Sequence, residues 1–351
     1  IAAASAAAAG ARLAGAQAVV ALTDLGITGV ATAGAHTGPL IDFAQAVVGV
    51  DVVLGAYNDA PIAEHVGSTL VVEHAWKGET YGRTHLHFEG GVLTASAADV
   101  VVADASKVTP DPAAEALLAP YRAQLSAKLD AKVSTAAATF SLDATIERTA
   151  EVPLGDLVAD AMLAKYAPAG AQIAVINAAG IRDALPSSYG PADMTLRRPL
   201  PGYGAGPPWD LVAGDAYTVL PFGNACVVRT ISGATLWQLL EQSVSSFPSQ
   251  ANGFLQIAGF SFTFSASAGA GARVQSVTLA DGTPIGRADT QTALTLVDDD
   301  YLDGGGDDYG MLIQSPPAQP QELVADVLLD YLRSAATVTP AASATRIVQM
   351  P

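Results

Sequence analysis

Short apolar runs rich in β-branched residues, separated by turns and helical stretches, are the sequence feature that most constrains this fold. Gln17–Leu22 is one such run, and Asp51–Gly55 repeats the pattern after a helical stretch. Strands that alternate with helices form parallel α/β sheets, whose functional loops lie at the carboxyl ends of the strands. Three later runs alternate in the manner of antiparallel strands: Thr69–Glu73, Gly82–Phe88 and Val92–Val102. We therefore expect an α/β domain at the N-terminal end with two clear parallel strands, which is few for an independent domain.

The rest of the chain predicts a helix followed by a mixed α/β region. Asp111–Ala138 has apolar residues at three-to-four spacing and opens with Asp-Pro, which predicts a helical connector. Ser187–Pro208 is rich in Pro and Gly and predicts a long surface loop. The strands expected after the connector are Ile173–Ile176, Tyr217–Leu220, Val227–Ile231, a hairpin of Phe260–Phe264 with Val274–Leu279, and Ala293–Val297; the helices are Leu154–Tyr166, Ala234–Ser243 and Glu322–Arg333.

The composition describes a well-packed globular protein with an acidic surface. Of 351 residues, 50% are hydrophobic and 15% are charged, with a formal net charge of −17. Nucleic acid is a poor partner for such a chain, because phosphate backbones require Lys/Arg patches. The single cysteine, Cys226, excludes an internal disulfide and is expected to be buried as a small apolar residue. No run of 18 apolar residues predicts a transmembrane span, and Ile1–Ala21 lacks the features of a secretion signal, so we interpret the chain as mature or truncated.

Five motifs in the second half carry the functional information. They are EVPLGD at 151–156, NAAGIR at 177–182, GDAYTVLPFGN at 214–224, GFLQIAGF at 253–260 and DYLDGGGDDY at 300–309. In order and spacing they resemble the C-terminal domain of 5′-nucleotidases and the related bacterial UDP-sugar hydrolases and 2′,3′-cyclic phosphodiesterases. The resemblance implies an α/β fold with three parts. Residues 1–106 would be the C-terminal half of a metallophosphoesterase-like α/β sandwich, 107–143 a long helical connector, and 144–351 a mixed α/β substrate-binding domain.

The turn at residues 177–182 is suited to an anion. Its small residues, including Gly180, allow backbone amides and the side chains of Asn177 and Arg182 to approach a phosphate closely. The planar guanidinium of Arg182 matches phosphate geometry, although it could instead be tied to a carboxylate such as Asp183. The resemblance implies a second phosphate contact at Arg148, whose alternative is a solvated charge at a strand end.

Two aromatic residues and an aspartate complete the expected nucleoside slot. The resemblance implies that Phe222 and Tyr301 stack on the base, that Asp307 and Asn177 bind polar groups of the nucleoside, and that Asn224 also contacts the substrate. Base stacking on an aromatic ring contributes about 1–3 kcal/mol for each base. The alternatives are burial of the rings in the core and, for Asp307, a solvated acidic loop or a calcium site.

The first part departs from the family where metal ligands belong. The strands at VVALTDLG (19–26) and GVDVVLGAYNDAP (49–61) resemble those that carry metal-binding histidines in the family, but Asp24, Tyr57 and Asp59 stand there instead. The family uses a pair of divalent metals (Zn, Mn, Mg or Ca) to activate water against phosphorus, and about seven ligands are needed. The chain does not supply this set, so we assign no catalytic and no metal-binding residue. His85 and His87 alternate on one strand face and are expected to be surface residues.

Half of a parallel sheet would expose apolar strands to water, so we expect a missing N-terminal segment or a partner chain to cover it. The favoured function is a periplasmic or extracellular nucleotide or nucleotide-sugar phosphohydrolase. The alternative is a catalytically inactive nucleoside or nucleotide binder, with a place in a cell-surface assembly. A third interpretation, a structural α/β protein without ligand, must explain why both aromatic positions and Asp307 match the family.

Overall fold

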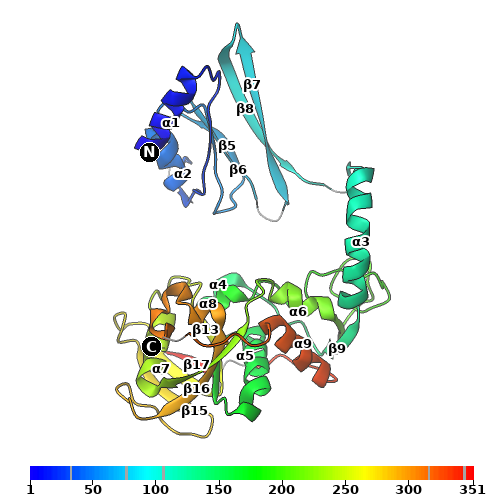
Figure 1. The fold of residues 1–351 in the computed structure, drawn as a ribbon, viewed down its shortest axis with the longest axis vertical. Coiled ribbons are helices and arrows are strands. Elements are labelled where there is room, and N and C mark those ends of the chain that lie inside the picture. Colours follow the sequence, from blue (N-terminus) through cyan, green and yellow to red (C-terminus); the bar gives the residue numbers. More distant parts are fainter. Residues whose placement is uncertain (32–33, 76–77, 105–106, 315–316, 343–344) are drawn as a thin grey trace. The chain divides into compact units, whose positions relative to one another are not determined.

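The computed structural model describes residues 1–31, 34–75, 78–104, 107–314, 317–342 and 345–351. The chain divides into two units, Ile1–Glu115 and Ala116–Pro351, and helix α3 (Pro112–Leu129) crosses the boundary. Each unit has its own sheets (Figure 1) and its own hydrophobic clusters, two of them in the second unit. Within the described residues, no helix is long and apolar enough to cross a membrane.

The first unit is built on a four-stranded sheet in the order β1-β4-β6-β5. Strands β1 (Val20–Leu22) and β4 (Val52–Leu54) pair in parallel, as the sequence predicts. Strand β6 (Thr69–Glu73) was expected to be antiparallel, and this is wrong for its pairing with β4, which is parallel. It also pairs antiparallel with β5 (Ile62–Val66). Every residue of β6 is buried, so the strand lacks the polar face that separates a half-exposed antiparallel strand from a central parallel one.

Two helices and a long hairpin complete this unit. The helices pack on one face of the sheet through Ala8, Leu40 and Ile41, against Val53 and Val71. The predicted antiparallel pairing of β7 with β8 is confirmed. The bounds of these elements are α1 Ala2–Leu13, α2 Pro39–Ala46, β2 Gly29–Val30, β3 His36–Thr37, β7 Thr80–Glu89 and β8 Val92–Val102.

The second unit is organised around a mixed sheet in the order β12-β16-β10-β13. All five residues of β10 (Ile173–Asn177) are buried, and their side chains alternate between two cores. Ala174 and Ile176 pack with α5 and α9, whereas Ile173 and Val175 pack with α7 and the small sheet of β14, β15 and β17. Strand β10 is parallel to β16 and antiparallel to β13. The sheet is therefore the middle layer of a three-layer unit. Cys226, at the start of β12, is buried as expected.

The remaining bounds in the second unit are β9 Lys132–Ala136, α4 Ala144–Glu147, α5 Pro153–Tyr166, η2 Ala167–Ala169, η3 Ala178–Gly180, β11 Trp209–Val212, α6 Ala213–Val219, β12 Cys226–Ser232, α7 Gly233–Ser243, β13 Leu255–Ala258, β14 Phe260–Ser265, β15 Val274–Leu279, β16 Ala293–Asp299, α8 Asp300–Asp303, η4 Gly306–Asp308, η5 Gly310–Leu312, α9 Val324–Ser334 and β17 Ile347–Met350. Two sequence predictions are wrong here. The connector helix stops at Leu129, and its expected end forms β9, which pairs with β11. Residues 217–220, expected as a strand, lie in and just after helix α6, which runs from Ala213 to Val219 and has Leu220 as its C-cap.

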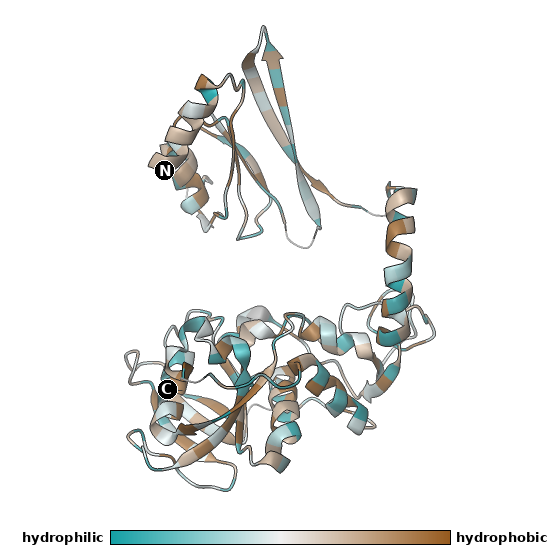
Figure 2. Ribbon diagram, viewed as in Figure 1, coloured by the Kyte–Doolittle hydropathy of each residue, from teal (hydrophilic) through white to brown (hydrophobic). Residues whose placement is uncertain are grey.

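Helix α3 carries apolar residues that the structure leaves unburied. Leu117, Tyr121 and Leu125 are exposed, and none of the helix's residues is buried. Figure 2 shows hydrophobic stretches along this helix, interrupted by hydrophilic ones. The three-to-four spacing in the sequence thus predicts the helix correctly but does not by itself indicate what packs against it.

The loop between η3 and β11 is anchored by a buried arginine. Arg198, expected on a surface excursion, has a fully buried side chain whose two terminal nitrogens donate to Asp215 at 2.7 Å each. The same nitrogens donate to the carbonyl oxygens of Asp210, Ser187 and Tyr189. These bonds satisfy both terminal nitrogens and offset the cost of burying the ion pair, whereas Nε has no hydrogen-bond partner in the described structure. The pair joins the loop to α6, which bears Asp215.

We predict that Arg198→Met lowers the free energy of unfolding of the second unit by about 3–5 kcal/mol, because the Asp215 carboxylate would lose its buried counter-ion. Urea unfolding followed by circular dichroism measures the change. Arg333→Met is the control, since Arg333 is exposed and lies 3.5 Å from Asp330. The control should cost less than about 1 kcal/mol. Equal losses in the two variants would contradict the anchoring role of Arg198.

Candidate functional site

The candidate site lies where two parallel strands of the central sheet end. Strand β10 ends at Asn177 and leads into the 3-10 turn Ala178–Gly180, and its parallel neighbour β16 ends at Asp299 and leads into α8. Because parallel neighbours have their carboxyl ends at the same sheet edge, the turn after β10 and the acidic loop after β16 meet there. The sequence motifs at 177–182 and 300–309 therefore come together through the sheet.

Asp307 connects the two loops. Its carboxylate accepts a hydrogen bond from Asn177 Nδ2 at 2.7 Å through one oxygen and from the Tyr301 hydroxyl at 3.1 Å through the other. The backbone of Asp307 is left-handed, with φ 50°. A non-glycine residue in this region is strained, and such residues concentrate at functional sites. A Cβ at the neighbouring Gly306 would lie 2.5 Å from the Tyr301 ring, so a side chain there would displace that ring.

The two predicted stacking residues both project out of the core. Phe222 is 60% exposed and Tyr301 is 45% exposed, so the alternative of burial in the core is wrong for both. They line one open cavity of about 360 Å³, a size suited to a small-molecule ligand. The other residues that line it are Asn177, Ala179, Gly180, Arg182, Asn224, Asn252 and Asp307.

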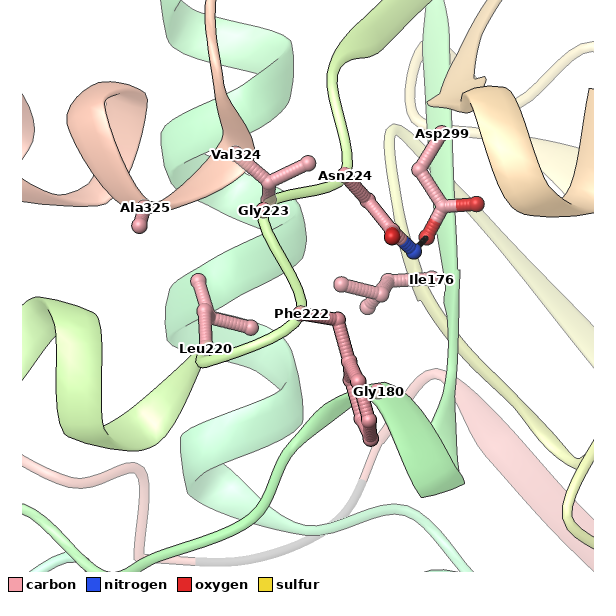
Figure 3. Close-up of a pocket in the computed structure, with 9 residues that line it drawn as sticks. All are labelled: Ile176, Gly180, Leu220, Phe222, Gly223, Asn224, Asp299, Val324 and Ala325. Atoms are coloured by element: carbon pink, nitrogen blue, oxygen red, sulfur yellow. Dashed lines mark hydrogen bonds between the residues drawn. The ribbon is translucent and has the colours of Figure 1, made fainter.

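Phe222 is held on a turn beside the loop after β10. Figure 3 shows its ring extending from the turn after Leu220 towards Gly180, while the Asn224 amide is joined to Asp299. The Asn224 Nδ2 donates to an Asp299 oxygen at 3.3 Å, and the other Asp299 oxygen caps α8 by accepting from the Leu302 N–H at 2.8 Å. Burial raises the pKa of Asp299 to about 6, against the lowering effect of these hydrogen bonds.

The Arg182 side chain is available to a ligand. Its guanidinium carbon lies 5.7 Å from the centre of the Phe222 ring, and the guanidinium has no hydrogen-bond or ion-pair partner among the described residues, whereas the backbone N–H donates to the Val219 carbonyl at 2.8 Å. The alternative that ties it to Asp183 is not realised, since that carboxylate accepts instead from Ser188 and Ala184. A cationic fork beside an aromatic ring is an arrangement that can bind a phosphate next to a stacked base.

Arg148 is the predicted site residue that does not line this cavity. It is half-buried, and its Nε is buried without a hydrogen-bond partner in the described structure. The preceding residue, Glu147, is 1% exposed and interacts electrostatically with both Arg148 and Arg182. The two arginines are therefore linked through Glu147.

Sequence reasoning missed Asn252 and Glu147. Asn252 lies on the segment that approaches the site before β13, where a Cβ on the adjacent Gly253 would lie 2.9 Å from the Asp307 Cβ. Asn252 could have been identified from the sequence by its position directly before the motif at 253–260. Glu147 carried the weaker signal of a carboxylate adjacent to a predicted phosphate-binding arginine, and only the fold shows that it is buried.

The first unit has no comparable site in its described residues. Asp24, Tyr57 and Asp59 follow the carboxyl ends of β1 and β4, and all three are exposed. The backbone is left-handed at Tyr57 and Asp59, with φ 90° and 56°. Across the described residues, no group of three or more His, Cys, Asp or Glu side chains is arranged to hold a metal. The residues present at these strand ends therefore do not fit a metal pair, and His85 and His87 lie exposed on β7.

Comparisons with known proteins match the second unit to a known domain family. A family model for the 5′-nucleotidase C-terminal domain matches residues 130–314. A trifunctional nucleotide phosphoesterase protein from Bacillus subtilis is 26% identical over 287 residues, which covers 78% of this chain and 18% of that protein. A cell wall protein from Listeria monocytogenes is 26% identical over 295 residues, covering 81% of this chain and 35% of that protein. The chain thus spans well under half the length of these two relatives.

A solved structure is similar over nearly the whole chain. The 5′-nucleotidase precursor from Thermus thermophilus matches with a TM-score of 0.71 and 25% identity, covering 99% of this chain and 66% of that one. The match extends over both units and supports the predicted fold class, which combines part of a metallophosphoesterase α/β domain with a mixed α/β C-terminal domain.

The buried carboxyls predict an acidic optimum of stability. Burial raises the pKa of Glu147 to about 7 and that of Asp299 to about 6, and it also raises the pKa values of Asp156 and Asp298. Because the folded state binds more protons than the unfolded state over this range, the free energy of unfolding should fall as pH rises from about 4.5 to about 7. Hydrogen-bonded carboxyls with a lowered pKa, such as Asp289, change the free energy of unfolding with pH only below about pH 4. Urea midpoints across this range measure the trend.

The Asp156→Asn variant tests whether the raised pKa values of the buried carboxyls cause this fall in stability. This variant should show a shallower decline between about pH 4.5 and 7, because one protonated carboxyl is replaced by a permanently neutral amide. Asp289→Asn is the matched control and should leave the slope in that range unchanged. Stability that rises with pH from 4.5 to 7 in the unmodified protein would contradict the assignment.

Proposed function

The chain belongs to the 5′-nucleotidase family, and on this basis we propose that its second unit binds the nucleoside part of a nucleotide or nucleotide sugar for phosphoester hydrolysis. One observation carries the proposal. Two exposed aromatic side chains, Phe222 and Tyr301, come from distant motifs and line the same cavity with Asp307 and Asn177. Aromatic rings paired with a few fixed polar groups are the usual means of holding a nucleobase and its sugar.

The polar groups give the ligand an orientation. The Asn177 and Asp307 side chains are held by their mutual hydrogen bond, which places fixed oxygen atoms at the cavity wall for the donors of a ribose or base. Arg182, beside Phe222, would take the phosphate, with Arg148 contributing a second positive charge. The nucleoside would therefore lie between the rings with its phosphate towards the arginines.

A second function, nucleotide binding without hydrolysis, is favoured by the first unit. Asp24, Tyr57 and Asp59 stand where the family resemblance places metal-binding histidines, and the described residues contain no group of three or more His, Cys, Asp or Glu side chains that could hold a metal. Hydrolysis by metal-activated water would need ligands beyond the described residues. The similarity to a cell wall protein supports a periplasmic or extracellular location and a role at the cell surface for either function.

The edge of the first sheet supports the expectation that further polypeptide covers it. Strand β1 is the edge strand of its sheet, and its Val20 and Leu22 side chains are 48% and 79% exposed. An apolar edge strand left open to solvent promotes aggregation. We propose that an additional segment of the protein, or a partner chain, packs along this edge.

We predict that Phe222→Ala and Tyr301→Ala each weaken AMP and UMP binding by about 5- to 150-fold, the equivalent of losing one stacked face worth about 1–3 kcal/mol. Isothermal titration calorimetry measures the change. Tyr121→Ala, which removes an equally exposed aromatic ring from α3, is the matched control and should bind normally. Unchanged affinity in both site variants would rule out the stacking slot.

We also predict that the chain of residues 1–351 binds nucleotide but releases no phosphate from AMP or UDP-glucose when Mn²⁺, Mg²⁺ or Zn²⁺ is added, because its described residues gather no metal site. A malachite green assay with and without EDTA measures release. The nucleotide affinity should be the same in both conditions. Metal-dependent release by this chain would show that the ligands are present after all and would remove the binder as a separate function.

A further inference from the structure

Glu147 is a buried carboxylate beside the proposed phosphate-binding arginines, and the proposed function gives it no role. It ends helix α4 and is 1% exposed, and its Oε2 has no hydrogen-bond partner within the described structure. Its backbone is fixed, since its carbonyl accepts from Gln256 Nε2 at 3.0 Å. An ionised carboxylate without hydrogen bonds is costly to bury, so the site must either neutralise or compensate it.

Three charged groups act on the Glu147 carboxyl. Arg148 follows it in the chain, Arg182 lies on the segment after η3, against which α4 packs, and Asp143 caps the start of α4. The Asp143 carboxylate is occupied by the Thr145 amide and hydroxyl. The two arginines have no carboxylate partner within 4.0 Å in the described structure, and Arg148 Nε is buried without an acceptor. Glu147 is a buried carboxyl on which the charges of both arginines act.

We propose that Glu147 is a positioning residue that couples the binding of a nucleotide phosphate at Arg148 and Arg182 to the uptake of one proton. The inference rests on the proposed function of the cavity and adds a specific consequence, a distinction between nucleotide and nucleoside. When Glu147 is ionised, it competes with the phosphate for the guanidinium groups and repels it. When Glu147 is protonated, both arginines are free to bind the anion.

The sign of the pH dependence follows from this arrangement. In the free protein, burial raises the pKa of Glu147 to about 7, with the arginines opposing the shift. A bound phosphate adds a second negative charge and draws on the same arginines, so it favours the protonated form further. Nucleotide affinity should therefore fall as pH rises above about 7, whereas a nucleoside, which lacks the phosphate, should bind independently of Glu147.

The test compares the unmodified chain with Glu147→Gln, whose amide is a permanent neutral substitute of the same shape. Dissociation constants for AMP and UMP, and for adenosine and uridine, are measured by calorimetry from about pH 6 to about pH 8.5. We expect the ratio of nucleotide dissociation constants, unmodified over variant, to rise by up to about tenfold per pH unit above about 7. The ratio for the nucleosides should stay flat. The phosphate's own second ionisation, near pH 6, is common to both proteins and cancels in the ratio.

Direct proton counting makes the test independent of the variant's folding. Titration of the unmodified chain with AMP and UMP at about pH 8, in two buffers of different ionisation enthalpy, should show uptake of nearly one proton that the nucleosides do not show. Nucleotide binding with a flat ratio and no proton uptake overturns the coupling and leaves the proposed function intact. An equal pH dependence for the nucleosides also overturns it. Failure of every nucleotide and nucleoside to bind overturns both proposals.

Discussion

The parallel pairing of β10 with β16 is the constraint on which the candidate site depends. It places Ile173 opposite Leu296 and Ala174 opposite Val297, so both strands run out at one sheet edge. Without that edge, Asn177 and Asp307 would have no reason to meet, since they lie on loops far apart in the chain. The hydrogen bond between them converts two strand ends into one wall of the cavity. Gly306 and Gly253 are then fixed by sterics, because side chains there would displace Tyr301 and Asp307.

The second unit treats its buried charges in two ways. Asp215 is fully buried, and its two oxygens are both met by Arg198, which makes the pair a structural anchor for a loop. Asp298 is equally buried, yet neither of its oxygens has a hydrogen-bond partner in the described structure, and burial raises its pKa well above the usual value. It directly precedes Asp299 at the end of β16, and Glu147 adjoins the arginine pair. Carboxyl oxygens without hydrogen-bond partners therefore occur around the candidate site, where a protein can use an energetically unfavourable group for function.

The sequence anticipated which residues line one cavity better than it anticipated the path of the chain. The motifs carrying Asn177, Tyr301 and Asp307 indicated short polar turns after strands, and such turns keep their character in any α/β sheet, whereas the Phe222 turn follows helix α6 and not the expected strand. Strand direction was harder, because an apolar run such as 69–73 is compatible with a parallel centre or an antiparallel pair until its neighbours are known. The loop holding Arg198 was predicted to lie on the surface for a similar reason. Pro and Gly indicate the backbone geometry of a segment but do not indicate whether its side chains are buried. Glu147 needed the fold itself, because its burial arises from packing against segments more than thirty residues away.

The candidate cavity is built by the second unit alone. Every residue that lines the candidate cavity belongs to the second unit. The hydrogen bond between Asn177 and Asp307 and the segments that carry Phe222 and Tyr301 lie in that unit as well. The fixed geometry of the cavity is supplied by the mixed sheet, so the proposed nucleoside site draws none of its lining residues from the first unit. Changes at the strand ends of the first unit, such as those that the family resemblance implies at Asp24, Tyr57 and Asp59, leave this lining unchanged. A fold built in this way can keep its ligand while losing or relocating its reaction, because the cavity's contacts and the metal ligands draw on different sheets.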